Sequence, residues 1–393
     1  MANVSSSNAL EKRPKLRFPG FDEPWSIYKA EELFKNVADK NHPMETVLTI
    51  IQGKGTLPRE QAGRNIHYDD ASLANYKKVE QGDFIIHLRS FEGGLEMANE
   101  DGIVSPAYTI LRCMKPHSSL FYEAYFHTDE FINHILSKSV EGIRDGRQIS
   151  YEAFKWLGLP YCDLSEQERI AQLFCTLSHR IEKQQQMVDA LKKYKRGVVA
   201  AIFSHQLKFS DATGNPYPEW TSCTLQDAVD FLDGQRKPLE SADRAKRQGQ
   251  YPYYGASGII DYIDDFIFDE PLLLLGEDGA NILNRSTPLC FIAEGKYWVN
   301  NHAHVMRPKA GQNIKFLCEL LESLDYTRYN TGTAQPKLNQ DKCRRIGLAL
   351  PVYEEQCHIA DFLSAFDQRT DKAQSILDYL LSNRDGLLQQ LFI

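Results

Sequence analysis

The chain has 393 residues, which at roughly 100–200 residues per domain predicts two domains or more. Hydrophobic residues make up 42% and charged residues 25%, and no apolar run reaches the ~18–20 residues that span a bilayer, so we expect a soluble globular protein. The net charge of −8 excludes a protein that simply coats a polyanion, but local basic clusters can still bind DNA.

Residues 1–15 carry serines and charges without an apolar segment, so they are predicted to form a disordered tail rather than a secretory signal. The eight cysteines stand singly, and none forms a C-x-x-C pair. This pattern predicts neither a metal site nor a disulfide framework, and it fits a reduced, cytoplasmic location.

The first globular region is expected over residues 16–157. It mixes strand-like runs, such as 83–88 and 107–111, with a helical stretch at 119–136, which predicts an α+β domain. Arginine and lysine can pair with guanine and glutamine with adenine in the major groove, so basic and amide side chains in its loops are candidate DNA contacts. They are Lys54, Arg59, Arg64, Arg89, Arg144, Arg147 and Gln148.

A long helix is predicted within the next segment, residues 158–206. Residues 166–203 contain no proline, and their apolar residues recur at the 3.5–3.6 spacing of a coiled-coil seam. A helix of this length would extend ~57 Å at 1.5 Å per residue.

A second globular region is expected over residues 207–347, with strands at 272–275, 289–293 and 304–306 and a helix at 314–324. Basic and aromatic residues alternate in its first third, and paired polar residues follow near its end. These candidate DNA contacts are Arg236, Lys237, Tyr253, Tyr254, Ser257, Asn301, His302, Gln335 and Lys337.

The last segment, residues 348–393, repeats the first helix. Residues 355–392 align with residues 166–203 without gaps, and eleven of the 38 positions are identical where background composition gives about two. A Leu-Pro pair precedes both stretches, and Leu16-Arg-Phe18 with Trp25 recurs as Leu207-Lys-Phe209 with Trp220. The chain is therefore a tandem duplication of ~190 residues, each copy a globular part followed by a helix.

Two long helices in one chain can bury their seams against each other. We expect an antiparallel coiled coil with one globular domain at each end and a pseudo-twofold relation between the copies. The alternative is that each helix packs only on its own domain. The residues expected to pair the helices are Ile170, Leu177, Leu191, Ile359, Phe366 and Leu380.

Catalytic motifs are sparse. The chain has no G-x-x-x-x-G-K-[ST], G-x-S-x-G or H-E-x-x-H sequence, so no catalytic residue is assigned. One weak pattern remains, because Asp278 and the Glu294-Gly-Lys296 triplet follow buried strands in the order used by many Mg²⁺-dependent nucleases. A nuclease and a helical scaffold that never touches DNA are therefore kept as alternative functions.

Tandem globular domains with repeated Glu-Gln-x-x-Ile-Ala helices resemble the specificity subunit of type I restriction–modification enzymes. The most specific segments are 253–302, which contains Tyr253-Tyr-Gly-Ala-Ser257, Leu275-Gly-Glu-Asp-Gly-Ala280 and Asn300-Asn-His302, and 348–363. The first globular domain matches only in layout.

The resemblance implies that each globular part is a target-recognition domain reading one half of a bipartite DNA site, with the helices fixing the gap between the halves. It implies partners as well: two methyltransferase subunits that use S-adenosylmethionine to methylate adenine, and motor-nuclease subunits that use ATP and Mg²⁺ for restriction. The chain itself would hold no cofactor and catalyse nothing alone.

Overall fold

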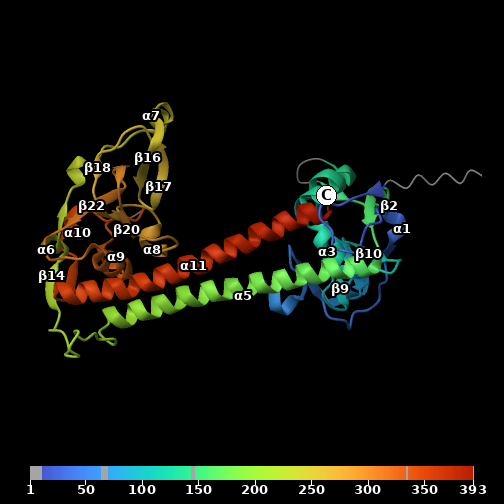
Figure 1. Cartoon of the computed structure of the whole chain (residues 1–393), viewed down its shortest axis with the longest axis horizontal. Coiled ribbons are helices and arrows are strands. Elements are labelled where there is room, and N and C mark those ends of the chain that lie inside the picture. Colours follow the sequence, from blue (N-terminus) through green and yellow to red (C-terminus); the bar gives the residue numbers. More distant parts are fainter. Residues whose placement is uncertain (1–10, 63–69, 143–146, 333–334, 393) are drawn as a thin grey trace, which may run out of the picture. The chain divides into compact units, whose positions relative to one another are not determined.

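The computed structural model describes residues 11–62, 70–142, 147–332 and 335–392. The chain divides into two compact units, Met1–Gln185 with Ser375–Ile393 (unit 1) and Gln186–Gln374 (unit 2). The chain has two helices of 40 residues, α5 (Leu164–Phe203) and α11 (Tyr353–Phe392) (Figure 1). Each of them has its first part in one unit and its last part in the other. They confirm the two predicted long helices. Among the described residues, no helix is long and apolar enough to cross a membrane.

Unit 1 is built on a four-stranded sheet in the order β3-β10-β7-β8. Its bounds are β3 (Phe34–Val37), β10 (Thr109–Cys113), β7 (Phe84–Ile86) and β8 (Glu96–Met97). The smaller sheets contain β1 (Glu11–Lys12), β2 (Trp25–Lys29), β13 (Gly158–Tyr161), β4 (Leu48–Ile51), β5 (Gly55–Pro58), β6 (Lys77–Val79), β9 (Gly102–Val104), β11 (Val140–Glu141) and β12 (Gln148–Ile149). The α-helices of the globular part are α1 (Ala30–Leu33), α2 (Ser90–Gly93), α3 (Ser119–Phe126) and α4 (Tyr151–Phe154).

Unit 2 contains an equivalent sheet in the order β15-β22-β19-β20. Its bounds are β15 (Val229–Phe231), β22 (Ala303–Pro308), β19 (Leu272–Gly276) and β20 (Cys290–Ala293). A second sheet, with no counterpart in the described part of unit 1, has the order β17 (Gly258–Ile263), β16 (Gln248–Gly255), β21 (Lys296–Val299) and β18 (Phe268–Asp269). Strands β14 (Thr221–Thr224) and β23 (Gly347–Leu350) pair, and the α-helices are α6 (Leu225–Ala228), α7 (Ser241–Lys246), α8 (Asn281–Asn284), α9 (Ile314–Ser323) and α10 (Gln340–Arg344).

The two four-stranded sheets have the same topology, so the duplication extends from the helices into the globular parts. Strand β10 pairs antiparallel with β3 and β7, as β22 pairs with β15 and β19. The predicted strand at 272–275 is confirmed as β19, whose five residues are all buried. The observed mixture of helices and sheets is the predicted α+β class.

The repeated Glu-Gln pair joins each long helix to its globular domain. In unit 1, Gln167 accepts a hydrogen bond from the N–H of Ser118, the residue before α3, and donates to the carbonyl of Cys162. In unit 2, Gln356 makes the same two contacts with Asn313, before α9, and Pro351. The glutamines are retained in both copies because each satisfies a backbone group at a buried helix start.

The end of each long helix packs into the core of the unit that the other helix begins. In unit 1 the ring of Phe392, at the end of α11, lies 5.2–6.1 Å from the rings of Trp25, Phe121 and Phe174. In unit 2 the ring of Phe203, at the end of α5, lies 6.2 Å from Trp220 and 5.8 Å from Phe316. Neither helix therefore packs only on its own domain. Each unit contains the start of one long helix and the end of the other.

The residues expected to pair the helices have different surroundings. Ile170 and Ile359 are fully buried in the cores of units 1 and 2. Phe366 packs against Tyr194 of α5, with ring centroids 5.5 Å apart. Leu380 is buried, whereas Leu177 and Leu191 are partly buried.

The beginning of the described chain also differs from the expected tail. Glu11 and Lys12 pair with Ser26 and Trp25 in an antiparallel bridge, so residues 11–12 are part of a sheet. The N–H of Leu16 donates to the carbonyl of Gln390 at 3.0 Å. Backbone pairing with the next strand, β2, and with α11, which is distant in sequence, places residues 11–16 in regular contacts although their composition indicated disorder. Residues 1–10 of the predicted tail lie outside the described residues.

Candidate nucleic-acid interface

Four segments of unit 2 meet beyond the carboxyl end of the buried strand β19. The N–H of Glu277 donates to the carbonyl of His302 at 2.8 Å, and the N–H of Leu338 donates to the carbonyl of Glu277 at 2.7 Å. The β16–β17 hairpin approaches the same place, since a Cβ atom on Gly276 would lie 2.7 Å from the carbonyl oxygen of Ala256. Glycine is therefore required at the end of β19, where another backbone passes close by.

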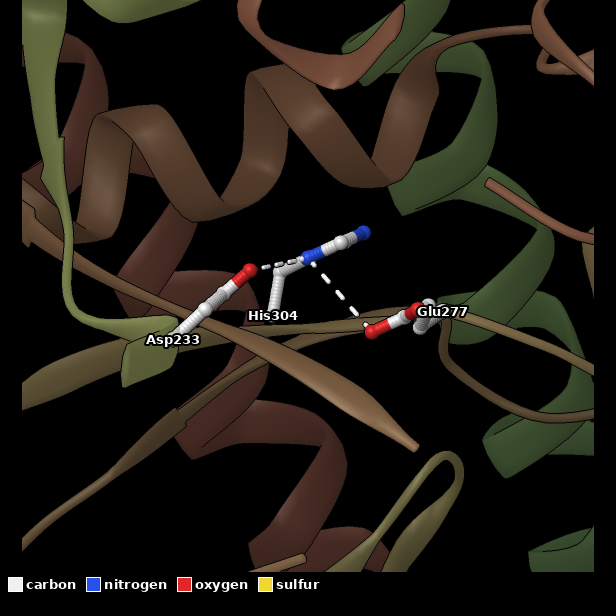
Figure 2. Close-up of side chains that lie close together, drawn as sticks. All are labelled: Asp233, Glu277 and His304. Atoms are coloured by element: carbon white, nitrogen blue, oxygen red, sulfur yellow. Dashed lines mark hydrogen bonds and ion pairs between the residues drawn. The ribbon is translucent and has the colours of Figure 1, made fainter. Parts of the chain in front are cut away.

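A buried cluster of charges ties these segments together (Figure 2). The Nδ1 atom of His304 lies 2.7 Å from Asp233 and 3.8 Å from Glu277. The guanidinium of Arg236 pairs with Glu277 at 2.8 Å and with Asp233 at 3.5 Å, and it also donates to the carbonyl of Ala303. We call Asp233, Arg236, Glu277 and His304 the buried ion cluster.

The protonation state of His304 follows from its two neighbours. Nδ1 faces the Asp233 carboxylate, and Nε2 lies 2.8 Å from the carbonyl oxygen of Leu338. Both neighbours only accept hydrogen bonds, so both ring nitrogens carry protons and the ring is a cation. Although burial lowers its pKa, hydrogen bonds to Asp233 and Cys343 and the charge of Asp233 raise the pKa of His304 to about 10.

The same contacts decide whether the cluster can hold a metal. Ligand atoms of Asp233, Glu277 and His304 lie within 4.8 Å of one another, a spacing compatible with a metal ion. Both nitrogens of His304 are occupied as donors, and Arg236 already neutralises the two carboxylates. The cluster is therefore a closed ion network, because a metal ligand must offer a lone pair.

Several predicted DNA contacts of unit 2 form the exposed rim of this cluster. Lys337 is half exposed and pairs with Glu277 at 3.2 Å, and His302 is half exposed and pairs with Asp278 at 2.8 Å. The remaining exposed candidates are Lys237, which directly follows Arg236, Ser257 in the β16–β17 turn, Asn301 and Gln335. Lys337 and His302, which are far apart in sequence, thus contact the consecutive residues Glu277 and Asp278.

Three other candidates from unit 2 are interior residues, which corrects the expectation that they face DNA. Arg236 is 13% exposed and is held by the buried ion cluster. Tyr253 is fully buried, and its hydroxyl accepts a hydrogen bond from the N–H of Leu239. Tyr254 is half buried and stacks on Phe291. Alternation within β16 turns successive side chains to opposite faces, and both faces are covered here.

Unit 1 gathers its own candidates around helix α2. Arg89 and Arg147 lie 2.7 and 4.0 Å from Glu92, and Arg147 also covers the ring of Phe91. Lys54 is exposed at the β4–β5 turn, whose Gly53 and Gly55 N–H groups bond the buried carboxylate of Glu96. Arg59 is half buried, Gln148 is exposed in β12, and Arg64 and Arg144 lie outside the described residues.

The carboxylates of the nuclease alternative are not brought together. Ala293, just before Glu294, pairs with Leu272 at the start of β19, whereas Asp278 follows the end of that strand. Six residue steps separate these ends, or ~20 Å at ~3.3 Å per residue. Two carboxylates on one Mg²⁺ must lie within a few ångströms of each other, so the sequence order D…ExK does not become a site here.

Comparison with known proteins agrees with this geometry. Residues 217–380 match the family described as the type I restriction modification DNA specificity domain. This range includes the rim, the buried ion cluster and the first part of α11. This match confirms the resemblance to the specificity subunits of type I restriction–modification enzymes for residues 217–380, which are less than half of the chain.

Two curated relatives carry the same description. The chain is 32% identical over 155 residues to the putative type I restriction enzyme specificity subunit S.HindORF215P of Haemophilus influenzae. It is 28% identical over 154 residues to the type I restriction enzyme EcoprrI specificity subunit of Escherichia coli. Each match covers 39% of this chain and 38% or 37% of the relative, so it spans well under half of either protein.

Solved structures extend the likeness of fold to almost the whole chain. The crystal structure of the type I restriction–modification system S subunit from M. genitalium superposes with a TM-score of 0.61 at 16% identity, covering 97% of this chain and 99% of that one. A chain from a structure on complex assembly and conformational transition of the type I R-M system superposes with a TM-score of 0.55 at 14% identity, covering 96% and 99%. At these identities the likeness concerns the fold.

Proposed function

We propose that this chain is the DNA-recognition subunit of a type I restriction–modification complex, and that unit 1 and unit 2 each read one half of a bipartite site. The observation that carries the proposal is the pair of topologically identical sheets, β3-β10-β7-β8 and β15-β22-β19-β20, whose corresponding edges present different polar residues. Identical scaffolds with different exposed edges suit two readers that share an architecture but recognise different bases.

The chain would act without chemistry of its own. Adenine methylation would be performed by two methyltransferase subunits with S-adenosylmethionine, and restriction by motor-nuclease subunits with ATP and Mg²⁺, in the cytoplasm. Both curated relatives are named as specificity subunits of type I restriction enzymes, one of them as putative, which supports this assignment. The long helices, which carry exposed apolar residues such as Met187, Tyr194 and Tyr379, offer surfaces on which such partners can dock.

Methylation sequencing of genomic DNA from cells with and without the gene tests the proposal. We expect one bipartite adenine-methylation motif to disappear when the gene is removed and to return when it is restored. An unchanged set of methylated motifs would contradict the proposal for that cell.

The nuclease alternative has its own readout. Cleavage of DNA by the isolated chain with Mg²⁺, abolished by Glu294→Ala, would favour it over the specificity subunit. Asp278 and Glu294 follow the carboxyl ends of two antiparallel strands, β19 and β20, and therefore lie at opposite edges of the sheet. We expect no such cleavage.

A further inference from the structure

One half-exposed histidine of unit 2, His302, is fixed by hydrogen bonds to its backbone and to its ring. His302 lies in the turn between β21 and β22, and half of its side chain is exposed. Its N–H donates to Asn300 Oδ1 at 2.8 Å, its carbonyl accepts from the N–H of Glu277 at 2.8 Å, and its ring Nδ1 lies 2.8 Å from Asp278 Oδ2. Backbone and ring are both fixed, although the residue has no part in the core.

Residues of the buried ion cluster form hydrogen bonds with the turn between β21 and β22. The guanidinium of Arg236 donates to the carbonyl of Ala303, directly after His302, at 2.7 Å. Glu277 uses its carboxylate to bind Arg236 and its N–H to bind the turn, while the next residue, Asp278, holds the imidazole. Two consecutive residues therefore connect a cluster that is nearly closed to solvent with a side chain that faces it.

The contact with Asp278 determines what the ring can offer. A carboxylate only accepts hydrogen bonds, so Nδ1 carries a proton. Nε2 makes no hydrogen bond within the described part of the chain, and in the neutral ring it is an acceptor. In the DNA major groove the complementary donors are the exocyclic amino groups of adenine and cytosine.

We propose that His302 is a base-reading residue of the half-site assigned to unit 2, that it accepts a hydrogen bond from an adenine or cytosine amino group, and that Asp278 is its positioning residue. This inference rests on the proposed function, which makes unit 2 a DNA reader. An exposed side chain that is already ordered loses little conformational freedom on binding, so the contact discriminates between bases at low entropic cost.

The test uses the full chain, purified from its host with the subunits that accompany it. The probe is a library of double-stranded DNA with two randomised segments, and the bound fraction is sequenced. For His302→Ala we expect the preference at a single position of one half-site to fall about five- to tenfold, the value of one hydrogen bond, with the other half-site unchanged.

Variants of Asp278 separate positioning from general damage. Asp278→Ala should weaken the preference at the same position, whereas Asp278→Asn keeps an acceptor for Nδ1–H and should restore most of it. The matched control is Asp39→Ala, which removes the partner of another histidine, the partly buried His42, at 2.9 Å in unit 1. It should leave the half-site of unit 2 unchanged. Thermal unfolding confirms that each variant is folded.

The outcomes distinguish the two levels of the proposal. If the unmodified protein enriches no two-part motif, the proposed function fails. If it enriches such a motif but His302→Ala leaves every position unchanged, or weakens all positions of the half-site equally, His302 is not a base-reading residue and this inference is overturned.

Discussion

Units 1 and 2 place different residues at equivalent points of the same sheet edge. The strand registers align Thr109 of β10 with Ile86 of β7, and His304 of β22 with Leu275 of β19. Two residues after Ile86, unit 1 has Leu88, and two residues after Leu275, unit 2 has Glu277. The next residue is Arg89 in unit 1 and Asp278 in unit 2. Two members of the buried ion cluster, Glu277 and His304, thus correspond in unit 1 to the neutral residues Leu88 and Thr109, and Asp278 corresponds to the cation Arg89.

This difference separates the scaffold from the reading edge. The parts that hold the sheet to the long helix are retained, as the matching contacts of Gln167 and Gln356 show. The residues at the exposed strand ends are free to diverge because they do not carry those contacts. A shared core sheet with different residues at one edge, and with the additional sheet β17-β16-β21-β18 in unit 2, suits two readers of different half-sites.

The largest effect that we expect concerns the two helix ends. Phe392 is fully buried in unit 1, whereas Phe203 is only partly buried in unit 2. Phe392→Ala should lower the free energy of unfolding of unit 1 by about 3–5 kcal/mol, and Phe203→Ala should cost unit 2 less, because a cavity is costly where the surroundings are closed. Hydrogen exchange resolved by peptide measures each unit separately. Equal losses in both units would contradict the difference.

A second comparison concerns the repeated glutamate. Glu166 binds Arg17 at 2.7 and 2.9 Å and the indole of Trp25 at 2.9 Å. Glu355 is only 4% exposed, and its Oε2 atom has no hydrogen-bond partner among the described residues. Burial raises the pKa of Glu355, although a hydrogen bond from Trp220 opposes this.

The two glutamates should therefore respond oppositely to neutralisation. Glu166→Gln leaves the guanidinium of Arg17 without its charged partner and should destabilise unit 1 by about 3 kcal/mol. Glu355→Gln keeps an acceptor for the indole of Trp220 and removes a buried charge, so the stability of unit 2 should be unchanged or slightly higher at pH 7. Urea unfolding of both variants measures this, and a comparable loss in Glu355→Gln would show that its carboxylate has a partner.

The smallest effect is a dependence on pH that only unit 2 should show. His304 has a pKa raised to about 10, above the ordinary value of 6.5, by its contacts with Asp233 and Cys343 despite burial. A raised pKa stabilises the fold fully below the unfolded-state value, and this stability is lost as the pH rises through the folded-state value. The equivalent position in unit 1 is Thr109, which does not titrate.

We therefore expect unit 2 to lose about 2 kcal/mol of stability between pH 7 and pH 9 through His304. The difference between the unmodified protein and His304→Gln isolates the contribution of His304 from that of the rest of the protein. Hydrogen exchange of β22 at both pH values is the measurement. The same slope in both proteins would show that His304 is neutral in the fold.

Sequence periodicity was enough to predict the long helices and the buried strand β19, because these patterns depend on neighbours a few residues away. It did not predict that Phe392 enters the core of unit 1, because that contact joins residues distant in sequence. For the same reason Arg236 was predicted on the surface. Its partner Glu277 is 41 residues away along the chain, and strand register alone brings the two together.

The central proposal, that each unit reads its own half-site, is tested most directly by exchanging residues 207–347 for the corresponding segment of one of the specificity subunits that the chain resembles. The methylated DNA of cells that carry the hybrid is then sequenced. The account predicts that one half of the recognised motif changes and that the other half and the spacing stay the same. A hybrid that changes both halves, or neither, would contradict it.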